Sequence, residues 1–211
     1  PPDFEELYMS LSPDETASSK VPILEHGEPG SEDYVKIIES NVILEYIEDV
    51  WGDVGIRLRP TSPEDAIAVR MFNDNFGKMS PFPLLMGATL EDLQNKMQEF
   101  AKGMRIIDRC LQVYKKKKID GDLLLGCEFS EAECMAAPIL VRTVQILNDI
   151  RGVDLQKLAD DLGLAHLSKW MAAVLSRPSV IKTTPTFNLA ENIVKVHPEW
   201  IKCKDKLVFT V

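Results

Sequence analysis

The alternation of apolar and polar residues between positions 20 and 51 predicts two short strands followed by a helix. Two apolar runs, residues 21–24 and 34–38, contain β-branched side chains and are separated by the sequence GEPGSED. Such runs on either side of a turn rich in glycine and proline are typical of a β-hairpin. Because serine is a favourable N-cap, Ser40 predicts the start of a helix. The apolar face of that helix follows at helical spacing and consists of Val42, Ile43, Tyr46, Ile47 and Val50.

Helical spacing is also present on both sides of this segment, at residues 3–11 and from residue 62 onward. Residues 3–11 have a short amphipathic pattern, and Ser62 and Pro63 precede two acids in the arrangement of a helix start. Residues 78–89 interrupt the pattern with prolines and a glycine, which predicts a loop or a distorted helix end. A strict heptad stripe then covers residues 89–118 and consists of Leu90, Leu93, Met97, Phe100, Met104, Ile107, Leu111 and Tyr114.

The heptad stripe suits either a coiled-coil strand or one helix of a bundle. A bundle is the favoured interpretation, because Gly103 weakens the helix and further apolar faces follow. Residues 131–150 are apolar nearly all round, so this helix is predicted to be buried on every side. It opens with Ser130 and Glu133 in the positions of a capping box, and Pro138 predicts a kink.

Two shorter helices are expected at residues 154–162 and 167–175, the second ended by Arg177 and Pro178. The segment after Asn188 fits a lid, an edge strand or a disordered end. Its last residues, KLVFTV, have the composition of a strand that could pair with a sheet edge.

Composition narrows the classes of function. The 211 residues are 45% hydrophobic and 27% charged, as in a folded soluble protein. The net charge of −9 argues against nucleic-acid binding, and the lysines of residues 115–118 fit the C-terminal end of a helix. No apolar run approaches the ~20 residues of a membrane span, so no membrane association is expected. The cysteines have no metal-binding spacing, which predicts reduced thiols in a cytoplasmic location and no metal site; they are Cys110, Cys127, Cys134 and Cys203.

Pro22 and the pair Glu39-Ser40 are the candidate binding residues. Alone, Pro22 suits the edge of a sheet, Glu39 a solvated charge and Ser40 an ordinary helix cap. A cis bond at Pro22 would turn the polar backbone groups of Val21 outward, where they could pair with an extended peptide. A helix N-terminus favours a carboxylate, and Glu39 could face an ammonium group. Together these groups describe a receptor for a short γ-glutamyl peptide.

The pattern VPILEHG followed by IIESNVILEYIED resembles the glutathione transferase family, and the resemblance covers residues 3–187. It implies an α/β plus all-α fold, with a partial thioredoxin-like N-terminal domain followed by an all-helical bundle domain. The expected boundaries are residues 1–52 for the first domain, 53–62 for a linker, 63–187 for the helical domain and 188–211 for a tail. The amino-acid sequences of the two motifs are most similar to those of the omega, lambda and dehydroascorbate-reductase branches of the family. The family usually has aspartate at the position of Glu133.

The resemblance implies that glutathione is bound as a co-substrate through Val21, Pro22, Glu39 and Ser40. The resemblance begins after the family's first strand-helix-strand, which is therefore expected to be missing from these 211 residues. In the family, the residue that stabilises the glutathione thiolate lies near that first strand, so it is expected upstream of residue 1. The second substrate is expected to be a small hydrophobic electrophile or a disulfide, in a pocket near Phe76, Met79, Phe82 and Met135. An enzyme that forms a homodimer is expected; the alternative is a non-catalytic module with the same fold, used for binding or assembly.

Overall fold

The computed structural model describes residues 3–114, 120–186, 188–203 and 207. The chain divides into two compact units, an N-terminal unit (Pro1–Arg59) and a helical unit (Pro60–Val211). The division falls within the segment in which a linker is expected. The whole lysine run and most of the KLVFTV segment lie outside the described residues.

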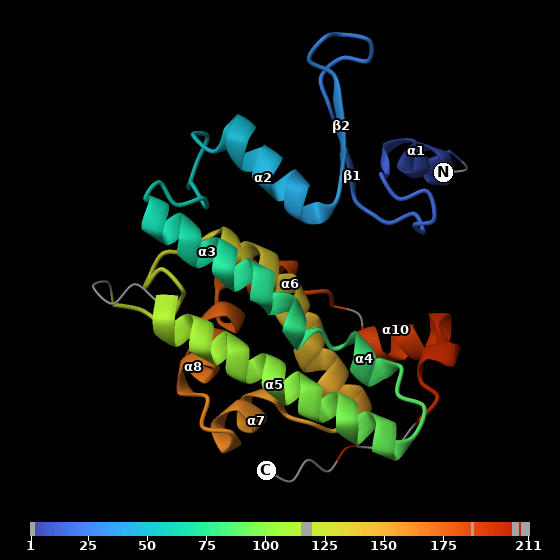
Figure 1. Ribbon diagram of the computed structural model, residues 1–211, viewed down its shortest axis with the longest axis vertical. Coiled ribbons are helices and arrows are strands. Elements are labelled where there is room, and N and C mark those ends of the chain that lie inside the picture. Colours follow the sequence, from blue (N-terminus) through green and yellow to red (C-terminus); the bar gives the residue numbers. More distant parts are fainter. Residues whose placement is uncertain (1–2, 115–119, 187, 204–206, 208–211) are drawn as a thin grey trace. The chain divides into compact units, whose positions relative to one another are not determined.

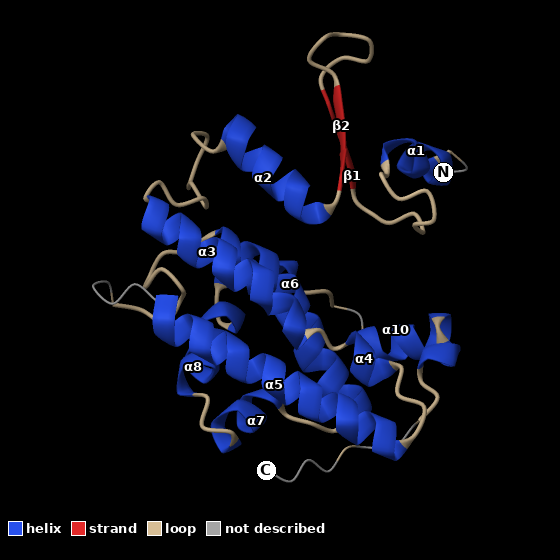
Figure 2. Ribbon diagram, viewed as in Figure 1, coloured by secondary structure: helices blue, strands red, loops and turns tan. Residues whose placement is uncertain are grey.

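The N-terminal unit consists of α1 (Phe4–Leu11), β1 (Ile23–His26), β2 (Val35–Ile38) and α2 (Ser40–Trp51). Within the described residues of this unit, β1 and β2 form a two-stranded antiparallel sheet (Figure 2). The register pairs Ile23 with Ile38 and His26 with Val35. At the turn, Gly27 has φ +91°, and an added Cβ would lie 2.9 Å from the backbone oxygen of Asp33. Glycine is therefore the residue that this turn requires.

Glu48 attaches the segment after α2 to the helix. Its carboxylate is 8% exposed and accepts hydrogen bonds from the backbone N–H groups of Leu58, at 3.2 Å, and Arg59, at 3.1 Å. The Arg59 guanidinium in turn donates to the Glu45 backbone oxygen at 3.0 Å. These contacts close the C-terminal end of the N-terminal unit, and they depend on tertiary structure that the apolar spacing does not reveal.

Helices joined by loops make up the described part of the helical unit (Figures 1 and 2), which also contains two isolated β-bridges. They are α3 (Pro63–Phe76), η1 (Gly77–Met79), α4 (Phe82–Leu85), α5 (Leu90–Tyr114), α6 (Glu131–Ile146), η2 (Leu147–Arg151), α7 (Leu155–Asp161), α8 (Ala165–Leu175), α9 (Pro178–Thr183), α10 (Leu189–Val196) and η3 (Pro198–Trp200). Helix α5 packs against α3 and α8, and α6 also packs against both. The heptad stripe therefore faces neighbouring helices of the same chain, as the bundle interpretation predicts.

Glu133 and Trp170 lie at the centre of this bundle. The capping box of Ser130 and Glu133 is present, and both the Glu133 carboxylate and the Trp170 ring are fully buried. The indole Nε1 donates to the Glu133 carboxylate at 3.1 Å, while the ring contacts Phe72 and Phe76 with centroids 5.2 Å and 5.7 Å away. The cap that starts α6 is thus joined directly to the aromatic core.

Arg151 connects three distant segments of the helical unit. Its fully buried guanidinium donates to the backbone oxygens of Leu84 at 2.8 Å, Leu85 at 3.0 Å and Cys203 at 2.7 Å. The Leu207 N–H donates to the Arg151 carbonyl at 2.9 Å. Residues near the C-terminal end are therefore held against α4 and η2 by hydrogen bonds.

One expectation about the helices is wrong, and one element is new. Helix α6 is not buried on every side, because Pro138 and Arg142 are exposed. These residues are four apart and share one helical face. In the segment after Asn188, residues Leu189–Val196 form α10, and the Asn188 side chain caps this helix by accepting from the Glu191 N–H at 3.1 Å. A lid, the first of the three alternatives for this segment, stays a prediction.

Candidate functional site

The hairpin register brings the predicted binding residues to one end of the sheet. Ile23 pairs with Ile38, so Pro22 immediately precedes one end of the ladder and Glu39 immediately follows it. Paired strands lie about 4.8 Å apart, which puts the two motifs side by side. Val21, Pro22, Glu39 and Ser40 are all exposed. An extended peptide could therefore contact both motifs at once.

The bond between Val21 and Pro22 is cis. Val21 is 80% exposed and lies outside the ladder, which begins at Ile23. Its backbone groups are thus separate from the pairing of β1 with β2.

Glu39 has an unusual backbone conformation at the start of α2. Its φ of 69° and ψ of 112° make it the one non-glycine residue with positive φ among those that the structure describes. Side chains other than glycine, asparagine and aspartate rarely adopt this region, and such outliers gather at functional sites. The Glu39 carbonyl accepts the first helical hydrogen bond, from the Ile43 N–H at 3.0 Å. Glu39 is therefore the N-cap, and the prediction that Ser40 holds this position is wrong by one residue, because Ser40 already has helical geometry.

The start of α2 is a favourable place for a ligand carboxylate. The first turn contains no acidic side chain, and its N–H groups form the positive end of a 12-residue helix. The Glu39 carboxylate lies just before this turn and accepts a hydrogen bond from the Tyr8 hydroxyl at 3.3 Å. Opposite charges of a single ligand, an ammonium and a carboxylate, could thus be bound at adjacent residues.

Tyr8 is a site residue that sequence reasoning missed. Its side chain is 2% exposed, and burial together with the charge of Glu39 raises the pKa of the Tyr8 hydroxyl above its usual value. The hydroxyl is therefore protonated at neutral pH and acts as a donor. At helical spacing Tyr8 shares a face with Phe4, Leu7 and Leu11, which could have predicted its burial, but no local pattern links it to a residue 31 positions away.

The residues of the predicted substrate pocket have different environments. Phe76 and Met79 are each 1% exposed and belong to the core of the helical unit. Phe82 is 46% exposed, and Met135 is half-buried. The pocket itself stays a prediction.

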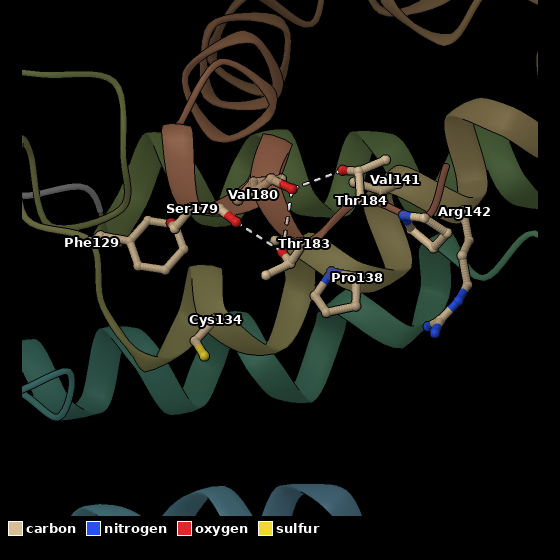
Figure 3. Close-up of a pocket in the computed structure, with 11 residues that line it drawn as sticks. Phe129, Cys134, Pro138, Val141, Arg142, Ser179, Val180, Thr183 and Thr184 are labelled. Atoms are coloured by element: carbon tan, nitrogen blue, oxygen red, sulfur yellow. Dashed lines mark hydrogen bonds between the residues drawn. The ribbon is translucent and has the colours of Figure 1, made fainter. Parts of the chain in front are cut away.

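A separate cavity of about 360 Å³ lies between α6 and α9 within the helical unit (Figure 3). It is lined mainly by apolar groups, with Cys134, Pro138 and Arg142 contributed by the partly exposed face of α6. On the α9 side, the Thr183 and Thr184 hydroxyls donate to backbone oxygens of their own helix at 2.8 Å. Cys134, Pro138 and Arg142 are spaced by four residues and therefore share one face of α6, which is the sequence signal that could have located this cavity.

The Cys110 thiol offers little reactive thiolate. Cys110 is 6% exposed, and burial raises the pKa of its thiol, so the neutral form dominates. Cys203 is buried as well, whereas Cys127 is exposed on the loop before α6. The expectation that the residue stabilising the glutathione thiolate lies upstream of residue 1 stays a prediction.

Curated proteins and solved structures that are similar to this chain are named as glutathione transferases. No protein-family model matches the chain. The curated protein Glutathione S-transferase U17 from Arabidopsis thaliana is 24% identical over 200 residues, which cover 92% of this chain and 80% of that protein. The crystal structure of glutathione transferase Omega 3C from Trametes versicolor superimposes with a TM-score of 0.62 at 22% identity, over 78% of this chain and 66% of that one. The chain resembles the glutathione transferase family and has its fold.

A second solved structure with the glutathione transferase fold contains a ligand. Glutathione transferase YghU from Streptococcus pneumoniae, complexed with glutathione, superimposes with a TM-score of 0.55 at 17% identity, over 82% of this chain and 63% of that one. The chain thus spans slightly less than two thirds of these two solved structures. The predicted fold class, a partial thioredoxin-like domain followed by a helical domain, is confirmed. Within the described ranges, no helix is long and apolar enough to cross a membrane.

Proposed function

We propose that this chain binds glutathione at the end of the β1–β2 hairpin. The observation that carries the proposal is the register, which sets the cis Val21–Pro22 bond beside the Glu39-Ser40 step. The glutathione transferase fold and the glutathione found in a structure of that fold support the choice of ligand.

Each residue has a distinct role in the proposed complex. The exposed backbone of Val21, oriented by Pro22, pairs with the cysteinyl part of glutathione as an added strand would. The Glu39 carboxylate binds the γ-glutamyl ammonium group, and Ser40 with the first N–H groups of α2 binds the γ-glutamyl carboxylate. Because both γ-glutamyl charges are recognised, the site would discriminate glutathione from peptides that lack the free amino acid end.

The proposed reaction is conjugation of glutathione to a small electrophile, or thiol transfer to a disulfide, in a cytoplasmic homodimer. A residue that stabilises the glutathione thiolate is needed for either reaction, since the pKa of an unperturbed thiol is about 8.5. The second candidate is a glutathione-binding module without turnover. This candidate requires only the binding groups at the end of the hairpin.

Titration calorimetry of the 211-residue chain with glutathione tests the binding site. Replacing Glu39 with glutamine removes the charge that faces the ammonium group, and we expect affinity to fall about 10-fold or more, as for other hydrogen-bonded charge pairs. Ser40→Ala should weaken binding by about 3- to 10-fold. Glu28→Gln is the matched control, because Glu28 lies in the turn at the opposite end of the hairpin.

Absence of glutathione binding by the parent chain, or equal affinities for the parent and Glu39→Gln, would contradict the proposed site. Conjugation and thiol-transfer assays on the same samples separate the two candidates. Turnover supports the transferase, and binding without turnover supports the module.

A further inference from the structure

We propose that Tyr8 is a positioning residue for the ligand site, and that its hydroxyl orients the Glu39 carboxylate toward the ammonium group of the bound peptide. This inference rests on the proposed function. It assigns helix α1, which contains none of the predicted binding residues, a part in ligand recognition.

The placement of Tyr8 is the first argument. It is the buried residue of α1, at 2% exposure, and α1 packs against β2, the strand that leads into Glu39. The ring is therefore fixed by the fold, and its hydroxyl comes to 3.3 Å from Glu39 Oε1.

The chemistry of the carboxylate is the second argument. A carboxylate has two oxygens with about four acceptor positions, so a hydroxyl on Oε1 leaves Oε2 for a ligand. The last torsion of a glutamate side chain is broadly distributed, and an exposed carboxylate rotates freely unless a neighbour holds it. A donor that removes this freedom before binding lowers the entropy that is lost on binding.

The backbone of Glu39 is the third argument. The backbone at Glu39 has a positive φ, a conformation that glutamate rarely adopts, and this conformation sets the direction in which the side chain leaves the backbone. The Tyr8 hydroxyl then holds the far end of the same side chain. Backbone and carboxylate are thus constrained by separate parts of the N-terminal unit, which is the arrangement of a preorganised binding group.

A comparison of two ligands tests the inference on the 211-residue chain. The first ligand is glutathione, and the second is its des-amino analogue, in which hydrogen replaces the γ-glutamyl amino group. Tyr8→Phe keeps the buried ring and removes only the hydroxyl. We expect about 3- to 10-fold weaker binding of glutathione but less than about 2-fold weaker binding of the analogue, because the hydroxyl acts through the partner of the ammonium group.

Two further variants make the test specific. Tyr34→Phe is the matched control, since the Tyr34 hydroxyl donates to Glu25 toward the other end of the hairpin, and it should leave both affinities unchanged. In a Glu39→Gln background, Tyr8→Phe should have much less effect on glutathione affinity than it has in the parent. Thermal unfolding of each variant checks that the N-terminal unit is intact.

The outcomes separate this inference from the proposed function. If the parent chain fails to bind glutathione, both are wrong. If it binds, and Tyr8→Phe weakens both ligands equally or neither of them, only the role of Tyr8 is overturned.

Discussion

The Glu133 carboxylate is a single buried group that satisfies donors from three segments of the helical unit. Its Oε1 accepts from the Leu124 N–H at 2.8 Å and from Trp170 Nε1 at 3.1 Å. Its Oε2 accepts from the N–H and the hydroxyl of Ser130, at 3.0 Å and 2.7 Å. A charged group is stable at 0% exposure when its acceptor positions are filled in this way.

Replacing Glu133 with alanine should destabilise the helical unit strongly. The change leaves these buried donors without their acceptor and removes the Glu133 half of the capping box of α6, so we expect the free energy of unfolding to fall by about 3–5 kcal/mol. Chemical denaturation followed by the fluorescence of tryptophan and by circular dichroism measures this loss. Glu128→Ala, which removes an exposed acid five residues earlier, should change stability by less than about 0.5 kcal/mol. A loss below about 1 kcal/mol for Glu133→Ala would show that the carboxylate network is not a main source of stability.

The residues of the candidate site differ in how far the sequence reveals them. Glu39 and Ser40 are recognisable because a strand pattern changes to a helix pattern at that point. The neighbouring residues alone are therefore enough to locate them. Tyr8 contacts Glu39 only after α1 has packed on β2, and a short helix can pack in several ways with the same sequence pattern. Long-range partners of a local motif were therefore missed, although the motif itself was found.

At the scale of elements, α5 depends on a close approach that the heptad stripe does not describe. Gly103 is buried within α5, and a Cβ built there would lie 2.2 Å from the backbone oxygen of Lys78 in η1. The sequence presents Gly103 as a weak point of the helix, because glycine lowers helix propensity. In the structure this glycine is what allows η1 to pack against α5.

A pair of glycine substitutions tests this packing. Gly103→Ala gains up to about 1 kcal/mol of helix propensity but forces backbone apart, and we expect a net loss of about 1–2 kcal/mol of unfolding free energy. Gly77→Ala is the matched control, since its Cβ would meet nothing within 4 Å and its φ of −56° suits alanine. That change should stabilise the unit by about 0.4–1 kcal/mol. Equal effects of the two substitutions in thermal unfolding would rule out the steric explanation.

Element boundaries follow the same division between local and long-range information. Helices α3 and α6 begin where their caps predict, because Ser62 and Ser130 accept hydrogen bonds from N–H groups of their own first turns. Helix α10 was missed although Asn188 caps it. A single cap followed by only eight helical residues is a weak signal, and α10 is packed against α6 by contacts that span some fifty residues of sequence.

At the scale of the whole molecule, the buried apolar side chains are divided unequally between the two units. In the described part of the N-terminal unit they are Tyr8, Ile38 and Ile43. The main core cluster, by contrast, extends from Ala68 to Leu207 and lies entirely within the helical unit. Apolar burial is the main favourable term in folding, so the two units should differ in their capacity to fold alone.

Expression of the two units as separate fragments tests this difference. Residues 60–211 contain the core, the Glu133 network and the Arg151 hydrogen bonds, and we expect this fragment to keep its helical circular dichroism and to unfold cooperatively. Its melting temperature should lie within about 5 °C of the helical transition in the 211-residue chain, which corresponds to a difference of ~1–2 kcal/mol for a domain of this size. Residues 1–59 bury too little apolar surface around a two-stranded sheet, so that fragment should be largely unfolded. If residues 1–59 folded cooperatively alone while residues 60–211 did not, stability would not follow the distribution of the core. The site that depends on Tyr8 and Glu39 would then belong to the more stable part of the chain.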